Sequence, residues 1–176
     1  MFDGPPRFPE QKDGKGQLLS DQSLKAGDPI FFNVYFRQNG PNPVVFLGSI
    51  RTTYLETDFK EETEQKLIAE FKKISSNDWR KYRANRQKQK REPPAFQVGQ
   101  SSWNSAYGFS GTAQPLHWTQ DDLNALRAGN EVAVVLTEIA YEDNHKPHHA
   151  RRCEVLQPPA IPPGTWHLCD GFNGTD

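Results

Sequence analysis

The chain has 176 residues and a formal net charge of −1 at neutral pH. This length fits one domain of ordinary size, and the charge excludes an overall attraction to nucleic acid or anionic lipid. Apolar residues make up only 35% of the chain, but eleven Phe, five Tyr and four Trp supply large side chains for a core. No stretch approaches the roughly 18 consecutive apolar residues that a membrane span needs. We therefore expect one soluble domain with an aromatic core.

The first residues differ in composition from the rest of the chain. Residues 1–16 combine Gly, Pro and charged side chains, without the apolar stretch of a secretory signal. They are predicted to form a flexible leader in front of a single domain over residues 17–176. A Met followed directly by such a segment favours the loss of something upstream, such as a membrane anchor.

Two β-strands are predicted next. Phe32, Val34 and Phe36 alternate with polar neighbours within residues 29–37, as in a half-buried strand. A Gly-, Pro- and Asn-rich turn follows, and then a second strand with five side chains expected on one face: Val44, Phe46, Ile50, Thr52 and Tyr54. The turn predicts that the two strands pair as antiparallel neighbours.

The hydrophobic period then changes from two to 3.6. Leu67, Ile68, Phe71 and Ile74 lie on one face of an amphipathic helix over about residues 60–74. Ser76 is expected to cap a second helix, which ends before Pro93. Residues 57–94, helical over about 58–92, are thus a predicted helical insertion between strands.

A short helix over about residues 120–128 has the clearest local signals. Thr119 and Asp122 form a capping-box pattern, and Gly129 supplies the left-handed stop. A long strand, a turn over residues 142–147 and a return strand follow. With a last strand over 165–169, the total is about seven strands, which favours a mainly β fold: an antiparallel, immunoglobulin-like β-sandwich.

Three segments carry a resemblance to a known group of proteins. They are residues 99–109, residues 123–143, and the ending from Cys153 to Asn173 with its Trp-His-Leu-Cys-Asp-Gly-Phe run. These segments resemble the soluble C-terminal domain of uncharacterised bacterial proteins that are anchored by an N-terminal membrane segment. The resemblance implies an anchored β-sandwich and no established activity; the His- and Pro-containing turn at 145–149 departs from the shorter hairpin expected there.

A basic stretch ends the helical insertion. Seven bases and no acid occur in twelve residues, and six of them form a candidate anion-binding surface: Arg80, Arg83, Arg86, Lys88, Lys90 and Arg91. The structural alternative is that acids at the start of the insertion and bases at its end stabilise the helix dipoles.

The Gly- and Ser-rich stretch over residues 99–111 is a candidate ligand site. It presents Trp103, Asn104, Tyr107 and Phe109 among few bulky neighbours. Aromatic rings with polar edges beside small polar residues are typical of binding loops. The alternative is that these rings fill the end of the core.

Cys153 and Cys169 are the only two cysteines and lie on neighbouring predicted strands. They predict a structural disulfide, with a pair of buried free thiols as the alternative. A weaker alternative is a zinc site made by His149, Cys153, His167 and Cys169, since positions i and i+2 share a strand face. The spacing matches no short zinc motif.

No phosphate loop, serine elbow or HExxH motif occurs, so the sequence nominates no catalytic residue and no cofactor. We expect a non-enzymatic binding module for a protein or small ligand, held at a membrane by the missing anchor. The expected location is the bacterial cell envelope, outside the cytoplasm, with the cytoplasmic side as the alternative. The competing hypotheses are a cytosolic ligand sensor or nucleic-acid or anionic-lipid binder that uses residues 80–91, and, third, a zinc-dependent enzyme.

Overall fold

The computed structural model describes residues 2, 25–38, 41–86, 95–96, 101–107, 116–144, 146–157 and 165–175. Its elements, in chain order, are β1 (Phe31–Arg37), β2 (Val44–Glu56), α1 (Glu61–Arg86), β3 (Ala95–Phe96), β4 (Ser101–Tyr107), α2 (Gln120–Ala128), β5 (Val132–Asp143), β6 (Lys146–Gln157), β7 (Thr165–Leu168) and β8 (Gly174–Thr175). All strand pairs are antiparallel. The predicted mainly β, antiparallel fold with two helical regions is confirmed.

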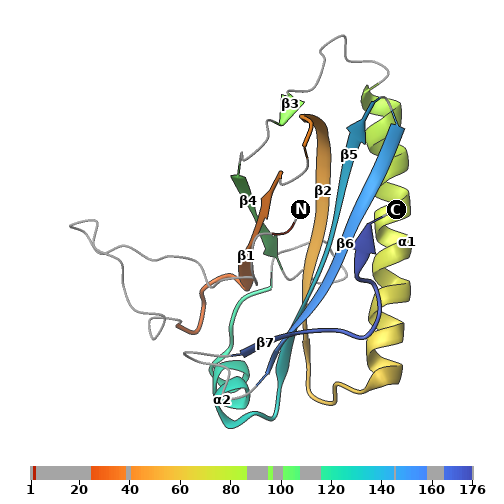
Figure 1. Ribbon diagram of the computed structural model, residues 1–176. Coiled ribbons are helices and arrows are strands. Elements are labelled where there is room, and N and C mark those ends of the chain that lie inside the picture. The colour runs from red at the N-terminus through yellow and green to blue at the C-terminus, as the bar shows by residue number, and fades with distance from the viewer. Residues whose placement is uncertain are drawn as a thin grey trace, which may run out of the picture.

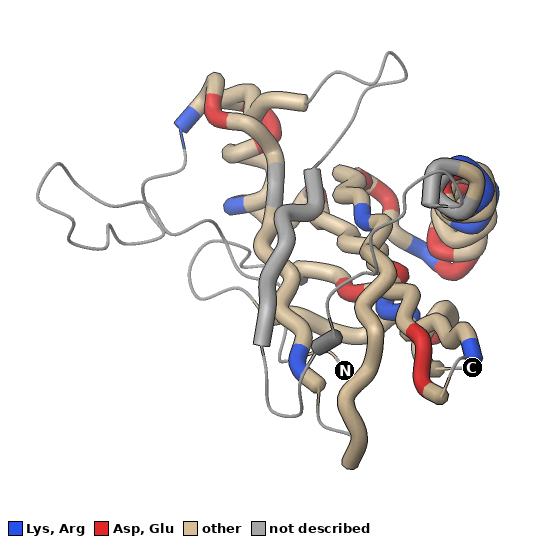
Figure 2. The backbone as a smooth tube through the Cα atoms, turned by 90° about the horizontal axis from the view of Figure 1, so that it is seen from above, with Lys and Arg blue, Asp and Glu red and all other residues tan. Residues whose placement is uncertain are grey.

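The strands form two sheets. One is an open six-stranded sheet in the order β3-β2-β5-β6-β7, in which β8 also pairs with β6; the other is the two-stranded ribbon β1-β4. Helix α1 lies along one face of the large sheet, whereas β1, β4 and α2 lie on the other side (Figures 1 and 2). An immunoglobulin-like sandwich is not confirmed, because a long helix covers the face opposite the small ribbon. The part of the chain that the structure describes has eight strands rather than about seven.

Strand β5 is the centre of the core. Its side chains are buried from Ala133 to Ala140, so both faces of the strand are covered. Val134 and Leu136 pack against α1. Val135 belongs to the core cluster that includes β1 and α2 on the other face. The alternation of side chains along β5 therefore separates two cores, each with its own covering layer.

The predicted pairing of the first two strands is wrong. β1 pairs with β4, where Tyr35 lies opposite Trp103, and β2 pairs with β5 along eleven register positions. Phe32 on β1 is fully buried against the face of the large sheet. The apolar face of β1 is therefore covered by stacking on the sheet, and β2 gains its long pairing with the central strand.

A β-bulge divides the expected apolar face of β2. The register with β5 shifts between Phe46 and Gly48, so one extra residue reverses which side chains point to which face. Phe46 packs in the cluster with Phe36 from β1, whereas Ile50 and Tyr54 pack in the cluster that contains α1. Gly48 lies under the Trp79 ring of α1, where a Cβ atom would be 3.5 Å from that ring.

The predicted insertion between strands is one continuous helix, not two. Ser76 lies inside α1 and caps nothing, and no Gly or Pro interrupts residues 61–86. The neighbouring Ser75 is buried and donates its hydroxyl to Glu138 on β5. This tertiary partner removes the competition with the helix backbone that makes serine a helix-ending residue. In the described part of the chain, neither helix combines the length and apolar character that a membrane crossing requires.

The predicted local signals around α2 and the last hairpin are confirmed. Thr119 and Asp122 form a complete capping box, and Gly129 takes the left-handed conformation at the end of α2. β5 and β6 form the expected hairpin, but the turn is shorter than the predicted 142–147: β5 runs to Asp143, β6 begins at Lys146, and Asn144 has a positive φ of 49°. Most of the proposed leader lies outside the described residues, but Phe2 forms a bridge with Phe36 and packs on the core.

Candidate functional site

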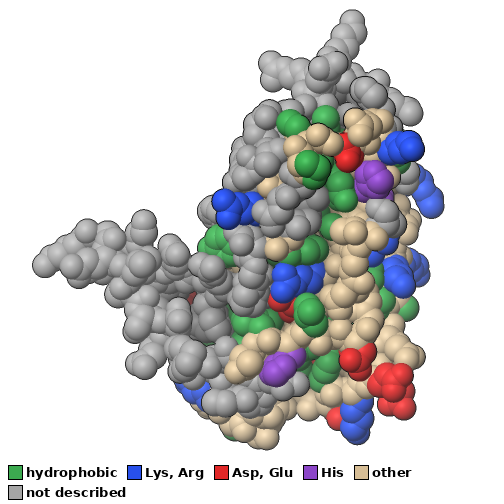
Figure 3. Space-filling model, viewed as in Figure 1, with side chains coloured by type: hydrophobic (Ala, Val, Ile, Leu, Met, Phe, Trp, Pro, Cys, Tyr) green, Lys and Arg blue, Asp and Glu red, His purple; other side chains and the backbone are tan. Residues whose placement is uncertain are grey.

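A cleft of about 760 Å³ opens between α1 and the large sheet, and we call it the α1 cleft. Its lining comes from α1, from β5 and β6, and from the last residues of the chain around β8. Side chains of Lys and Arg gather along the edge of the molecule where β6 and α1 lie (Figure 3). A cleft of this size suits a small-molecule ligand.

One face of α1 forms a wall of the cleft. Lys72, Ser75, Ser76, Trp79 and Arg80 all line it. Their spacing of three, four, seven and eight residues places them on one helix face. Trp79 is buried and its ring meets the ring of His149 edge to face, with the centroids 5.7 Å apart. The helix therefore presents one aromatic ring, that of Trp79, and two cationic side chains to the α1 cleft.

Glu138 on β5 is the buried acid of the cleft, with its side chain 5% exposed. One carboxylate oxygen accepts the hydroxyl of Ser75. The other lies 2.7 Å from Nδ1 of His149 and 3.4 Å from the guanidinium of Arg151, both on β6. Because a buried carboxylate is costly without partners, these three groups explain how Glu138 is held here.

The last residues of the chain form the opposite wall. Phe172, Asn173, Gly174 and Thr175 line the cleft, and β8 pairs with Ala150 and Arg151 of β6. The Phe172 ring packs edge to face on Phe71 of α1, with centroids 5.3 Å apart, and Lys72 Nζ lies 5.8 Å from its centroid. The C-terminal wall is thus part of the helix-side core.

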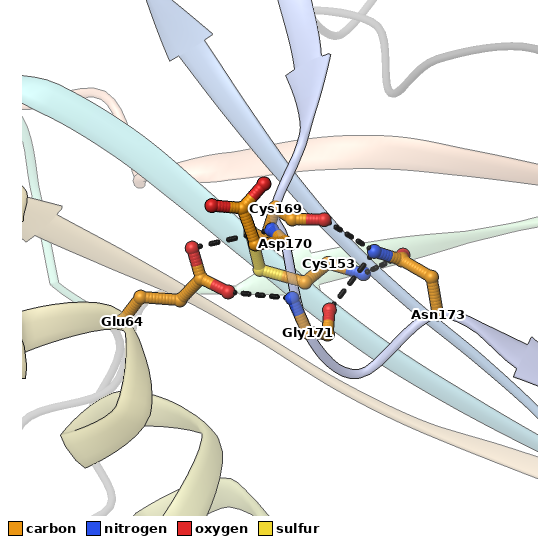
Figure 4. Close-up of a disulfide and its surroundings, with 6 residues drawn as sticks. All are labelled: Glu64, Cys153, Cys169, Asp170, Gly171 and Asn173. Carbon is orange, nitrogen blue, oxygen red and sulfur yellow. Dashed lines mark hydrogen bonds between the residues drawn. A yellow bond between two sulfur atoms is a disulfide. The ribbon is translucent and has the colours of Figure 1, made fainter. Parts of the chain in front are cut away.

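A disulfide attaches this wall to the sheet. Cys153 on β6 and Cys169, just after β7, are bonded to each other, with their Cα atoms 5.4 Å apart. The side chain of Asn173 accepts the backbone N–H of Cys153 at 3.0 Å and donates to the carbonyl of Cys169 at 2.7 Å (Figure 4). The predicted pair of cysteines therefore lies beneath the wall of the cleft.

Glu64 attaches the same wall to the helix. Its buried carboxylate accepts the backbone N–H groups of Asp170 and Gly171 at 3.4 and 2.8 Å. Figure 4 shows Glu64 reaching from α1 to the turn that follows Cys169. Disulfide, Asn173 and Glu64 together fix residues 169–173 between α1 and β6.

The cleft does not contain the arrangement of a serine hydrolase. The Ser75 hydroxyl donates to Glu138, whereas His149 contacts Glu138 through Nδ1. In a hydrolase the histidine accepts the proton of the serine, and the acid holds the other side of the histidine. Here the acid lies between the two, so Ser75 and His149 do not form such a pair.

The predicted anion-binding residues are only partly brought to this site. Arg80 lines the cleft. Arg83 and Arg86 lie on the last turns of α1, with backbone alone described, and Lys88, Lys90 and Arg91 lie outside the described residues.

The predicted ligand loop remains a prediction. Trp103, Asn104 and Tyr107 lie on β4, opposite Tyr35, Val34 and Phe31 of β1. Phe109 lies outside the described residues, as do the side chains of the other three candidates.

The alternative zinc set is not assembled. Cys153 and Cys169 are bonded to each other and His149 contacts Glu138. His167 is exposed on β7. Within the described ranges, no three His, Cys, Asp or Glu side chains lie together as metal ligands would.

Another buried carboxylate, that of Glu154 on β6, lies on the sheet face away from α1. It pairs with Arg152 at 2.9 Å, and the Arg152 guanidinium lies 5.5 Å from the centroid of the Phe2 ring. Burial raises the pKa of Glu154 to about 7, against the opposing effect of Arg152. This pair does not line the α1 cleft.

Sequence reasoning missed most of the cleft. Glu138 had a signal, since it is a lone acid within a strand that is otherwise apolar on that face. The helix wall also had one, in the repeat of polar and aromatic residues from Lys72 to Arg80. Residues 172–175 had none, because only the disulfide and the tertiary contacts bring them to α1.

Comparison with protein-family models, curated proteins and solved structures finds no match to this chain. The resemblance to domains of membrane-anchored bacterial proteins therefore stays a prediction.

Proposed function

We propose that this protein is a non-enzymatic binding module and that the α1 cleft holds its ligand. One observation supports the proposal most strongly: three separate parts of the chain converge on one cleft of about 760 Å³ that contains aromatic, cationic and hydrogen-bonding side chains. Sites for small molecules combine this volume with a few placed polar groups.

The way in which the cleft is built supports binding rather than catalysis. Ser75 and His149 each contact Glu138, which lies between them, so the serine–histidine pair of covalent catalysis is not formed. The C-terminal wall is fixed by a disulfide and by Glu64. A cleft whose walls are fixed before the ligand arrives loses little entropy on binding.

The proposal also includes our expectations about the parent protein, its location and its fold type. The module belongs to a membrane-anchored bacterial protein, and its disulfide suits a location outside the cytoplasm. An immunoglobulin-like arrangement of β1, β4 and the large sheet is the finer fold hypothesis. Nucleic-acid or lipid binding through residues 80–91 is the competing function; zinc-dependent catalysis has no support from the cysteines, since they are bonded to each other.

Four small benzene derivatives that differ in charge test the proposal. Phenyl phosphate, benzoate, benzylammonium and benzyl alcohol are each titrated into the ¹⁵N-labelled protein, and amide and indole shifts are followed by NMR. We expect saturable shifts from at least one compound at Ser76, at the Trp79 indole and at Thr175, which all line the cleft.

The location of the shifts decides the outcome. Shifts that centre on β4 would assign the ligand site to the predicted aromatic stretch instead. An absence of saturable shifts at the cleft for all four compounds would also overturn the proposal.

A further inference from the structure

We infer that the ligand of the α1 cleft carries an oxyanion, a phosphate ester or a carboxylate, that lies between Lys72, Arg80 and Arg151. The inference rests on the proposed function and specifies the chemistry of its ligand. Among the residues that the structure describes, three cationic side chains line the cleft, against the single carboxylate of Glu138.

The acid of the cleft is already compensated. Both oxygens of Glu138 have partners, in Ser75, His149 and Arg151, and the side chain is 5% exposed. A cationic ligand would have to displace a contact of a buried carboxylate, at the cost of its desolvation. The cleft therefore does not favour a cation through Glu138.

Arg151 pairs with Glu138, and the two cations of α1 that line the cleft differ from it. Lys72 and Arg80 are exposed, and within the described residues neither forms an ion pair. Asp78, the acid nearest to Arg80 in the sequence, lies 3.6 Å from Lys81 instead. Apart from the contact of Lys72 with the Phe172 ring, their charges are therefore available to a ligand.

The spacing of the cations suits an anion held between them. Lys72 and Arg80 are eight residues apart on α1, which separates their backbones by roughly 12 Å along the helix axis. Both side chains are long enough to lean toward a group at the centre of the cleft. The exposed hydroxyls of Ser76 and Thr175 lie in the same lining and can donate hydrogen bonds to an oxyanion.

A pair of double variants tests the inference on the full chain. Lys72→Gln with Arg80→Gln removes the two helix cations, and Lys66→Gln with Lys73→Gln removes two exposed cations of the same helix that do not line the cleft. Arg151 is left unchanged because it neutralises buried Glu138. The affinities for the four benzene derivatives are measured by NMR titration, and far-UV circular dichroism checks that each variant is folded.

We expect phenyl phosphate and benzoate to bind in the cleft, and benzylammonium and benzyl alcohol not to bind there. The first double variant should weaken anion binding by about tenfold, and the control double variant should leave it almost unchanged. The variant Lys72→Arg with Arg80→Lys, which keeps both charges, should bind the two anions with nearly the affinity of the wild type.

Two results would overturn the inference while leaving the proposed function in place. One is binding of benzyl alcohol or benzylammonium in the cleft as tightly as phenyl phosphate. The other is an equal loss of anion binding in both double variants, which would show a general effect of net charge.

Discussion

The carboxylate of Glu64 accepts the backbone N–H of Gly171 at 2.8 Å, although the two residues are 107 positions apart in the sequence. Its other oxygen faces the N–H of Asp170 at 3.4 Å. One side chain of α1 therefore fixes the turn that leads into the C-terminal wall of the α1 cleft. The contact makes the geometry of the cleft depend on a residue that does not line it.

Glu64→Gln should destabilise the protein by about 1–3 kcal/mol, because one charged acceptor is replaced by an amide donor that faces an N–H group. Urea unfolding measures this free energy. Glu62→Gln is the matched control, since Glu62 is an exposed acid in the same first turn of α1; it should change stability by less than about 0.5 kcal/mol. Equal effects of the two variants would assign the loss to the helix dipole rather than to the contact with Gly171.

The disulfide should resist alkylation in the absence of reductant. Intact-mass analysis after alkylation in denaturant should show no added mass, since Cys153 and Cys169 are the only cysteines. Two alkylated thiols in protein that was never reduced would contradict the bond and the location outside the cytoplasm that it favours.

Removal of the disulfide should lower the unfolding free energy by about 3 kcal/mol in the chain-entropy model for a loop of this length. The variant Cys153→Ala with Cys169→Ala tests this by urea unfolding. Removal of the disulfide should also speed up hydrogen exchange at the amides of Asp170 and Gly171, next to Cys169. The amides of α2 should show a smaller change. Unchanged exchange at these two amides would mean that Glu64 and Asn173 fix the wall without the disulfide.

Glu154 should make stability depend on pH. Its pKa in the folded protein is raised to about 7, above the value of an unfolded chain, mainly by burial. The folded state therefore binds its proton more tightly, and the stability that this supplies is present at low pH and is lost as the pH rises through about 7. We expect the difference in unfolding free energy between wild type and Glu154→Gln to change between pH 5 and pH 8, with the wild type relatively more stable at pH 5. A pH-independent difference would contradict the assignment.

The sequence predicted the local signals around α2 and the pairing of Cys153 with Cys169, but it did not predict the pairing of the first strands. The capping box of Thr119 and Asp122 was predictable because all of its atoms belong to neighbouring residues. The pairing of β1 with β4 was not, since the alternation in Phe32, Val34 and Phe36 predicts a buried face without saying which strand lies beside it. The bulge at Phe46 and Gly48 reversed the faces of β2 for the same reason: one extra residue is invisible to a period-two pattern.

The candidate site shows the same limit. Arg80 was predicted from a run of bases, but the other elements that line the cleft beside α1 are β5, β6 and the C-terminal residues around β8. Ser76 indicated a helix boundary, but α1 continues through it, and the neighbouring Ser75 bonds to Glu138 on β5. A buried acid and a serine 63 residues apart cannot be joined by sequence pattern alone.

The most direct test of the binding proposal is to fill the α1 cleft. Ser76→Trp places a large ring in the cleft, whereas Asn77→Trp places the same ring on an adjacent exposed position of α1 that does not line it. The affinity for phenyl phosphate, measured by NMR titration, should fall by about tenfold or more in Ser76→Trp and should stay close to that of wild type in Asn77→Trp. Equal affinity in the two folded variants would show that the ligand does not bind in the α1 cleft and would contradict the account.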